Sequence, residues 1–271
     1  MIKRYRVKNN DEEGTMSRLD KHSWVFEQPV AHRGLHDETG PENSLPAFQK
    51  AIDAGYPIEL DLHVLKCGRV VVFHDDDLKR MTGVDKPVEA TTYEEIKDLK
   101  LKDSTETIPL FEVALKLIKG RVPLMVELKS SQPTGKLEKA VMALLEDYSG
   151  DYVVQSFNPY ILGWFKKNAP EVIRGQLSGS LGDKKMNPVK KKLLQKMCLN
   201  FISKPDYINY EVNYSAHVNL KKYRKKGFKI LGFTVRSEAD YEKAMPFFDN
   251  IVFEFIDPRK YQTDRKAKHK T

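Results

Sequence analysis

Reactive side chains interrupt four short runs of apolar residues that otherwise have the composition of buried strands. The four segments are Ala31-His32-Arg33-Gly34, Ile58-Glu59-Leu60-Asp61, Phe73-His74-Asp75 and Val126-Glu127-Leu128-Lys129. Because a buried charge is costly unless it is paired or binds a metal, we expect these segments to meet in one site. Carboxylates, cations and imidazoles together suit the metal-assisted cleavage of a phosphate ester.

Three carboxylates in these segments form a candidate metal site. Glu59 and Asp61 are two residues apart and so project to the same face of a strand, and Glu127 follows in a later strand-like run. Oxygen donors of this kind suit a hard divalent cation, Mg²⁺ or Ca²⁺, with Mn²⁺ as a third candidate. A salt-bridge network with Arg33 and Lys129 is the alternative interpretation, and the two nearby histidines favour the metal site.

The other reactive residues have the chemistry for phosphate binding and proton transfer. Arg33 and Lys129 are cations that suit a phosphate group. His32 and His74 suit a proton acceptor for the attacking group and a proton donor for the leaving alkoxide. Three further histidines are secondary candidates, namely His36, His63 and His217, of which we interpret His63 as structural or supporting.

Strand-like and helix-like patterns alternate along most of the chain, which predicts a parallel sheet closed into a TIM-like (β/α)8 barrel. The expected strands are 29–32, 58–65, 124–128, 152–156, 173–177, 206–209, 229–235 and 250–255. The expected helices are 43–54, 110–118, 137–145, 159–167, 187–199, 216–226 and 238–244. Active sites of such barrels form where the strands end, so Glu59 and Asp61 are expected to close the second strand and Glu127 the third.

One segment breaks this alternation and predicts a small insertion after the second strand. Residues 70–73 follow that strand across a turn at 66–69, which indicates a hairpin carrying His74 at its end. A short helical pattern at 92–99 lies in the stretch before the helix at 110.

The ends of the chain predict an N-terminal arm at 1–27 and a basic tail at 261–271, with the barrel at 28–260. The N-terminal residues lack the apolar run of a signal peptide, and no segment has the length of a transmembrane helix. Two cysteines provide no disulfide framework. We therefore expect a cytoplasmic protein.

The net charge of +8 comes largely from lysines at 184–196, at 221–229 and in the tail. No zinc spacing or aromatic-interleaved basic motif accompanies them, so we expect no nucleic-acid partner. In the basic helix expected at 184–199, apolar residues recur at helical spacing, as at Val189 and Leu193. Weak contact with an anionic membrane surface is one interpretation. We favour an outer barrel helix whose apolar stripe packs on the sheet.

Several motifs resemble those of the glycerophosphodiester phosphodiesterase family. They include Ala31-His32-Arg33-Gly34, the run from Pro41 to Phe48, Glu59-Leu60-Asp61, Phe73-His74-Asp75, Ile108-Pro109-Leu110, Val126-Glu127-Leu128-Lys129 and Gln155-Ser156-Phe157. The resemblance runs from about residue 29 to residue 255 and is most specific in the first half.

The resemblance implies a TIM-like barrel that hydrolyses glycerophosphodiesters to sn-glycerol 3-phosphate and an alcohol with the help of a divalent cation. The residues that it implies are Glu59, Asp61 and Glu127 as metal ligands, His32 and His74 as general acid and base, Arg33 and Lys129 as the phosphate clamp, and Glu42 as a supporting residue. Two alternatives are a lysophospholipase D-like enzyme acting on membrane lipid diesters and an inactive barrel that only binds phosphodiesters. The complete set of His, Glu and Asp residues argues against the inactive barrel.

The C-terminal half departs from the family pattern at two strands. The seventh strand usually carries Trp before Thr-Val, whereas here Phe233 precedes Thr234-Val235, and Phe233 is expected to wall the glycerol pocket. The last strand usually ends in a Thr-Asp-Pro type motif, whereas here it carries Glu254, which is expected to replace a polar group at the barrel mouth.

Overall fold

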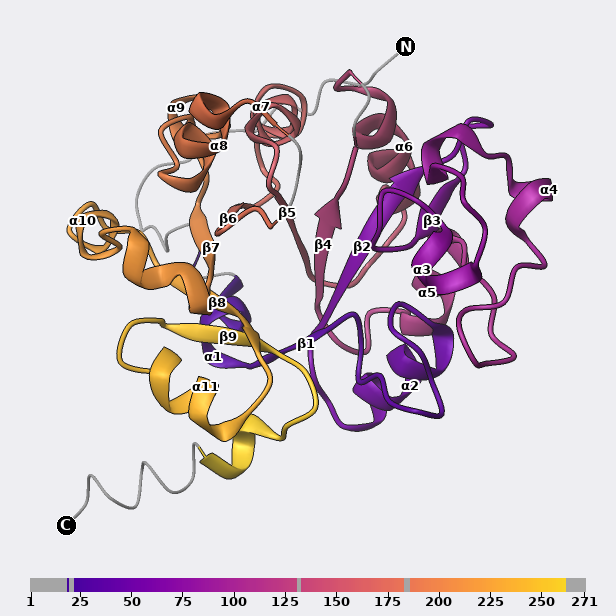
Figure 1. Cartoon of the computed structure of the whole chain (residues 1–271), viewed down its shortest axis with the longest axis horizontal. Helices are drawn as coiled ribbons and strands as arrows, with labels where there is room; N and C mark the ends of the chain where they lie inside the picture. The colour runs from indigo at the N-terminus through magenta and orange to yellow at the C-terminus, as the bar shows by residue number, and fades with distance from the viewer. Residues whose placement is uncertain (1–18, 20–21, 131–132, 183–185, 262–271) are drawn as a thin grey trace.

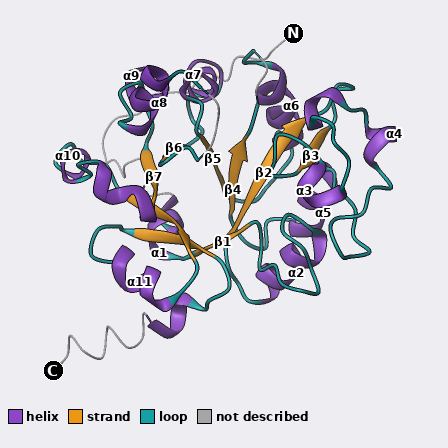
Figure 2. Cartoon of the chain, in the orientation of Figure 1, coloured by secondary structure: helices purple, strands orange, loops and turns teal. Residues whose placement is uncertain are grey.

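The computed structural model describes residues 19, 22–130, 133–182 and 186–261. Within them, nine strands form one sheet in the order β1-β9-β8-β7-β6-β5-β4-β2-β3. An additional pairing of β1 with β2 closes eight parallel strands into a barrel, to which β3 adds antiparallel at the edge of β2. Helices surround the strands (Figures 1 and 2). The predicted TIM-like barrel is confirmed.

The eight expected strands are all present, with ends shifted by at most two residues. The strands are β1 Val30–His32, β2 Ile58–Val64, β3 Val70–Val72, β4 Leu124–Leu128, β5 Tyr152–Ser156, β6 Arg174–Ser178, β7 Tyr207–Glu211, β8 Ile230–Val235 and β9 Asn250–Phe253. Glu59 and Asp61 lie within β2 and do not close it, because β2 continues past them to pair with β3.

The expected helices are present except in the segment between β6 and β8, and two short helices at 24–27 and 79–82 were not expected. The helices are α1 Trp24–Glu27, α2 Leu45–Asp53, α3 Lys79–Thr82, α4 Tyr93–Ile96, α5 Phe111–Ile118, α6 Lys136–Leu145, α7 Pro159–Asn168, α8 Pro188–Gln195, α9 Asn200–Ser203, α10 Lys221–Arg224 and α11 Glu238–Ala244, with 3-10 turns η2 Val88–Ala90 and η3 Val212–His217. None of these helices has the length and apolar character needed to cross a membrane.

Two helices that we expected to be continuous are each divided. The helix expected at 187–199 ends at Gln195, and Met197 adopts a left-handed backbone (φ 52°) before α9 begins. The helix expected at 216–226 is replaced by η3 and α10, because Val218 is extended (φ −133°, ψ 136°). The prediction of a single helix was wrong at both places. The apolar residues keep helical spacing through each break, so the spacing does not reveal the one or two residues whose backbone is not helical.

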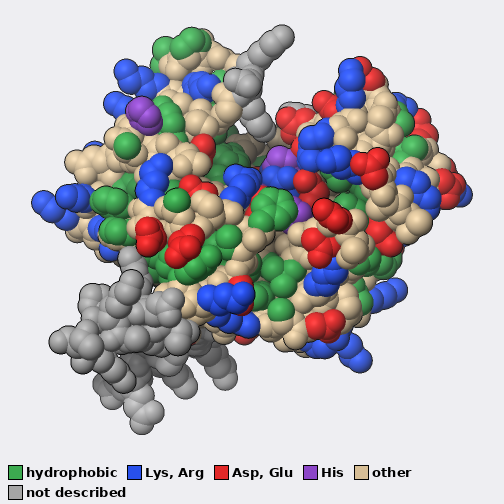
Figure 3. Space-filling view, turned by 60° about the horizontal axis from the view of Figure 1, so that its bottom comes forward, with side chains coloured by type: hydrophobic (Ala, Val, Ile, Leu, Met, Phe, Trp, Pro, Cys, Tyr) green, Lys and Arg blue, Asp and Glu red, His purple; other side chains and the backbone are tan. Residues whose placement is uncertain are grey.

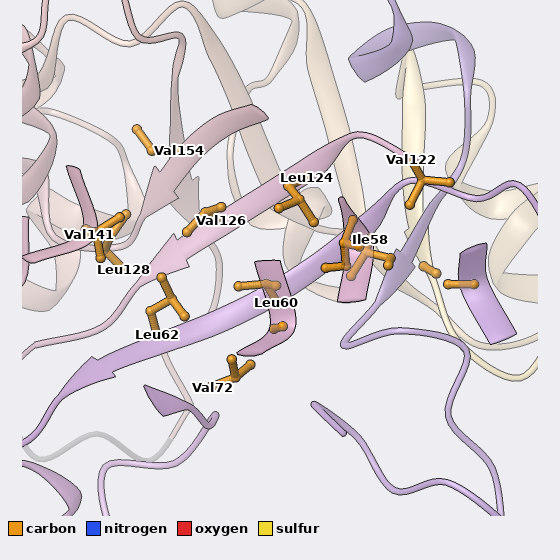
Figure 4. Packing of buried hydrophobic residues seen from close by; sticks show 14 of the residues in the cluster. Ile58, Leu60, Leu62, Val72, Val122, Leu124, Val126, Leu128, Val141 and Val154 are labelled. Carbon is orange, nitrogen blue, oxygen red and sulfur yellow. The ribbon is translucent and has the colours of Figure 1, made fainter. Parts of the chain in front are cut away.

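Alternating residues of the strands separate the core from the barrel interior. Ile58, Leu60 and Leu62 of β2 pack with Val126 of β4 and Val141 of α6, outside the barrel and under the helices (Figure 4). Successive strand residues face opposite sides, so the polar residues between them point into the barrel. This alternation delivers the carboxylates of β2 and β4 to a shared interior.

The helix α1 packs against the barrel core. Trp24 and Val25 are buried in one cluster with residues from the barrel strands, among them Val30, Met125 and Leu231. These last residues of the predicted arm therefore contribute to the core. The remainder of the arm, apart from residue 19 and residues 22–23, lies outside the described residues, as does the basic tail from residue 262.

The insertion after β2 has a small core of its own. The hairpin strand β3 and the elements α3, η2 and α4 enclose a cluster that includes Val71, Phe73, Met81, Val88 and Ile96. Because Phe73 is buried in this cluster, the next residue, His74, is held at the edge of the barrel mouth.

Candidate active site

The predicted site residues converge inside the mouth of the barrel. The sheet register sets His32 beside Glu59 and Asp61 beside Glu127, so side chains from three neighbouring strands lie at two adjacent levels of the barrel interior. His74 joins them from the insertion, and it lines a cavity of about 230 Å³ together with His32, Glu59 and Glu127. Figure 3 shows histidine, basic and acidic side chains around a hollow in the middle of the face in view.

Glu59, Asp61 and Glu127 form one compact cluster of carboxylates. Each offers an oxygen within 4.8 Å of the others, and all three side chains are buried. Burial and the charges of Asp61 and Glu127 hold the pKa of Glu59 well above its ordinary value. Buried oxygen donors that repel one another are the set that a hard divalent cation would stabilise. The cluster therefore fits the predicted cation site.

Two cations lie against this cluster. Lys129 Nζ is 2.6 Å from Glu127 Oε1 and 3.2 Å from Asp61 Oδ1. Arg33 Nε is 3.5 Å from Asp61 Oδ2, and its Nη1 donates to Glu42 Oε1 at 2.7 Å. Although burial disfavours charge, Asp61 and Glu127 raise the pKa of Lys129, so it stays protonated. The salt-bridge network that we considered as an alternative is thus present. Its ion pairs lie beside the candidate metal site, so the network and a bound cation do not exclude each other.

His32 is buried and is held through one ring nitrogen by Glu254. Its Nδ1 contacts Glu254 Oε1, while its Nε2 lies 3.8 Å from Glu59 Oε2 and faces the barrel cavity. Arg236 Nε donates to the second oxygen of Glu254 at 2.6 Å. Since a carboxylate only accepts, the proton of the neutral ring lies on Nδ1, which leaves Nε2 for proton exchange. Burial, with a smaller contribution from Arg33, lowers the pKa of His32 to about 4.

His74 is held in a similar way by its neighbour in the sequence. Its Nδ1 lies 2.6 Å from Asp75 Oδ1, and Arg80 donates to both oxygens of Asp75 at 2.6 and 3.0 Å. Arg80 also donates to Glu42, which links this histidine to Arg33. Glu42 therefore joins the two sides of the site through two arginines, a supporting position consistent with the prediction.

Two of the three secondary histidines lie beside the site, and none lies in its centre. His63 is buried, and its Nε2 lies 3.5 Å from the backbone oxygen of His74. His36 Nε2 is 3.7 Å from Glu254 Oε1. His217 lies in η3, packs on Tyr214, and does not line the barrel cavity.

Sequence reasoning missed three residues that orient the carboxylates. Asn43 Nδ2 donates to Asp61 Oδ2 at 2.8 Å, and Gln155 Nε2 donates to Glu59 Oε1 at 3.3 Å. Asn209 Nδ2 in turn donates to Gln155 Oε1 at 3.0 Å. Asn43 and Gln155 lie in motifs that carry the family resemblance. Asn209 offered only a weaker signal, a polar residue within a strand-like run.

Aromatic residues wall one side of the cavity. Phe233 of β8 packs edge to face on Phe157, with ring centroids 5.9 Å apart, and both line the cavity. Phe233 is therefore placed where a wall of the substrate pocket was expected.

Comparison with known proteins gives a family match over most of the chain. Residues 32–252 match the glycerophosphoryl diester phosphodiesterase family. The chain is 35% identical over 159 residues to the glycerophosphodiester phosphodiesterase of Caldanaerobacter subterraneus, an alignment that covers 55% of this chain and 65% of that protein. It is 27% identical to the putative glycerophosphodiester phosphodiesterase YhdW of Bacillus subtilis, over 84% of this chain and 94% of that one.

Solved structures show the same fold. A phosphodiesterase from Oleispira antarctica, determined in complex with the product sn-glycerol-3-phosphate, superposes with a TM-score of 0.67 at 24% identity, covering 84% of this chain and 92% of that one. A putative glycerophosphoryl diester phosphodiesterase from Agrobacterium tumefaciens superposes with a TM-score of 0.72 at 16% identity, covering 90% and 99% of the two chains.

Proposed function

This chain belongs to the glycerophosphoryl diester phosphodiesterase family, and on that premise we propose that it hydrolyses glycerophosphodiesters to sn-glycerol 3-phosphate and an alcohol. One observation carries the proposal: three buried carboxylates have oxygens within 4.8 Å of one another, and two of them line one barrel cavity together with His32 and His74. The relative from Oleispira antarctica, which was solved with sn-glycerol-3-phosphate, supports the same substrate class.

Glu59, Asp61 and Glu127 would hold the divalent cation, which supplies Lewis-acid polarisation of a phosphate oxygen when bound. Lys129 and Arg33 lie next to these ligands and would bind the nonbridging oxygens of the diester. Arg33 offers a planar fork of donors, so it orients the phosphate as well as neutralising it.

His32 and His74 would transfer the two protons that hydrolysis requires. Each presents Nδ1 to a carboxylate, which fixes the ring and leaves Nε2 for the substrate. The lowered pKa keeps His32 unprotonated near neutral pH, so its Nε2 is free to accept a proton from the attacking group. His74 would then donate a proton to the departing alcohol. Glu254 and Asp75 are positioning residues that act through these rings.

Release of sn-glycerol 3-phosphate from glycerophosphocholine tests the proposal. We expect protein treated with a chelator to be inactive, and Mg²⁺, Ca²⁺ or Mn²⁺ to restore turnover to an extent that identifies the preferred ion. Full turnover by metal-free protein in excess chelator would contradict the assigned role of the carboxylates. Lack of turnover with every ion and every glycerophosphodiester would contradict the proposed reaction.

A further inference from the structure

A second and larger cavity adjoins the catalytic one. It has a volume of about 910 Å³, compared with about 230 Å³ for the cavity inside the barrel. The two share His74, Lys129, Phe157 and Glu211 in their linings. A ligand whose phosphate lies against Lys129 can therefore extend into this outer groove on the side of His74.

Apart from Asp75, Asp76 and Asp77 beside His74, the outer groove is walled largely by apolar side chains. They come from the start of α7 and from the segment around α8, and include Tyr160, Leu181, Met186, Leu193 and Leu199. Tyr160 is 53% exposed and Leu193 39% exposed, so both present apolar surface to a ligand in the groove. Exposed apolar surface grouped beside a catalytic centre is typical of a binding site.

Hydrogen bonds at its C-terminal end hold the helix α8 in place and leave its apolar residues Val189 and Leu193 exposed. All eight of its residues are described and none is buried, so our expectation that the stripe packs on the sheet was wrong for Val189 and Leu193, although Met197, beyond the helix end, is buried in the core. Hydrogen bonds anchor its C-terminal end: Ser178 Oγ donates to the Leu194 oxygen at 2.9 Å, and Tyr210 OH donates to the Gln195 oxygen at 3.1 Å. These contacts satisfy carbonyls at the helix end and fix the wall without burying Leu193.

We propose that this outer groove binds a long alkyl or acyl chain on the alcohol part of the substrate, an inference that rests on the proposed function. The small polar cavity would take the glycerol, and the phosphate would lie between the two histidines. Water attacks phosphorus, the bond from phosphorus to the alcohol oxygen breaks, and the alcohol leaves with a proton from His74. The substrate class is thus an amphiphilic glycerophosphodiester, whose products are glycerol 3-phosphate and a long-chain alcohol or acylglycerol.

The size of the groove favours this occupant over a small charged alcohol. A choline or ethanolamine group would fill only a small part of about 910 Å³ and would leave the leucines in contact with water. A chain that covers them removes apolar surface from water, and each buried methylene contributes roughly fourfold to binding.

Two soluble substrates that differ only in chain length test the assignment. We would measure glycerol 3-phosphate release from the ethyl and octyl esters of sn-glycerol 3-phosphate, below the concentration at which the octyl ester forms micelles. We expect the wild-type kcat/KM to be at least about tenfold higher for the octyl ester. Leu193→Asp, and independently Tyr160→Ala, should remove most of that preference while leaving the ethyl ester within about twofold of wild type.

Val189→Asp is the matched control, because Val189 lies on the same helix, is 68% exposed and does not line the groove. It should keep the octyl preference. Equal loss in Val189→Asp and Leu193→Asp would assign the effect to the general surface of α8, for instance an interaction with lipid, and would overturn the groove. Equal wild-type rates on the two esters would also overturn it while leaving the proposed hydrolysis intact. Lack of release from both esters would instead remove the proposed function itself.

Discussion

The two sides of the barrel mouth hold a histidine by the same contact in different surroundings. His32 and His74 each turn Nδ1 toward a carboxylate, but the His32 side chain is 10% exposed and that of His74 is 32% exposed. Glu254, which holds His32, lies 222 residues away in the sequence, directly after β9, whereas Asp75 is the next residue after His74. One histidine therefore faces only the cavity inside the barrel, whereas the other lines both that cavity and the outer groove.

The largest effect is expected from substituting Asp61, one of the three carboxylates of the candidate metal site. Asp61→Asn should lower kcat/KM by about 10³-fold or more, because Lewis-acid assistance is worth several kcal/mol. Asp61 is fully buried and contacts both Arg33 and Lys129, so binding of Mn²⁺ should be measured together with activity. Near wild-type metal binding and turnover in this folded variant would show that the carboxylate cluster is only an ion-pair network.

Substituting each histidine in turn tests whether the two have different roles in proton transfer. His32→Ala and His74→Ala should each lower kcat on glycerophosphocholine by at least about 10²-fold, the lower range for general acid–base catalysis. A p-nitrophenyl diester needs no proton on its leaving group, so it should rescue His74→Ala and not His32→Ala. Rescue of His32→Ala alone would reverse the roles and place the alcohol on the closed side of the mouth.

The positioning carboxylates should matter less than the rings that they hold. Glu254→Gln should lower kcat by about tenfold to hundredfold with little change in KM, because the amide can no longer fix the proton of His32 on Nδ1. Asp75→Asn is the matched comparison on the open side. If Glu254→Gln changes KM as strongly as kcat, Glu254 shapes the pocket and does not act through His32.

The smallest expected effect concerns stability without metal. Burial and neighbouring carboxylates raise the pKa of Glu59 in the folded protein, so its contribution to stability is present at acidic pH and is lost as pH rises through that raised pKa. In chelator-treated protein we expect the Tm gain on adding metal to grow by a few degrees between about pH 5 and pH 8. Glu59→Gln removes this titration and should flatten the trend. A gain independent of pH in the wild type would contradict it.

The N-terminal half of the barrel could be predicted closely from the sequence because its signals are local. Carboxylates two residues apart in a strand must share a face, and β-then-α alternation at barrel length predicts closure. Glu59, Asp61, Glu127, His32 and His74 were all identified from such local runs. The structure gathers the three carboxylates into one cluster and places all five residues except Asp61 in the lining of one cavity.

Only the tertiary structure decided the features that depend on distant partners. Glu254 meets His32 because β9 pairs with β1, with Phe253 beside Ala31 in the register, and no local pattern encodes that contact. Likewise the spacing of Val189 and Leu193 predicted an amphipathic helix but not what lies against it. A periodic apolar stripe specifies which face of a helix is apolar. What that face lies against depends on contacts with distant residues, which here include the hydrogen bonds that Ser178 and Tyr210 donate to the end of α8.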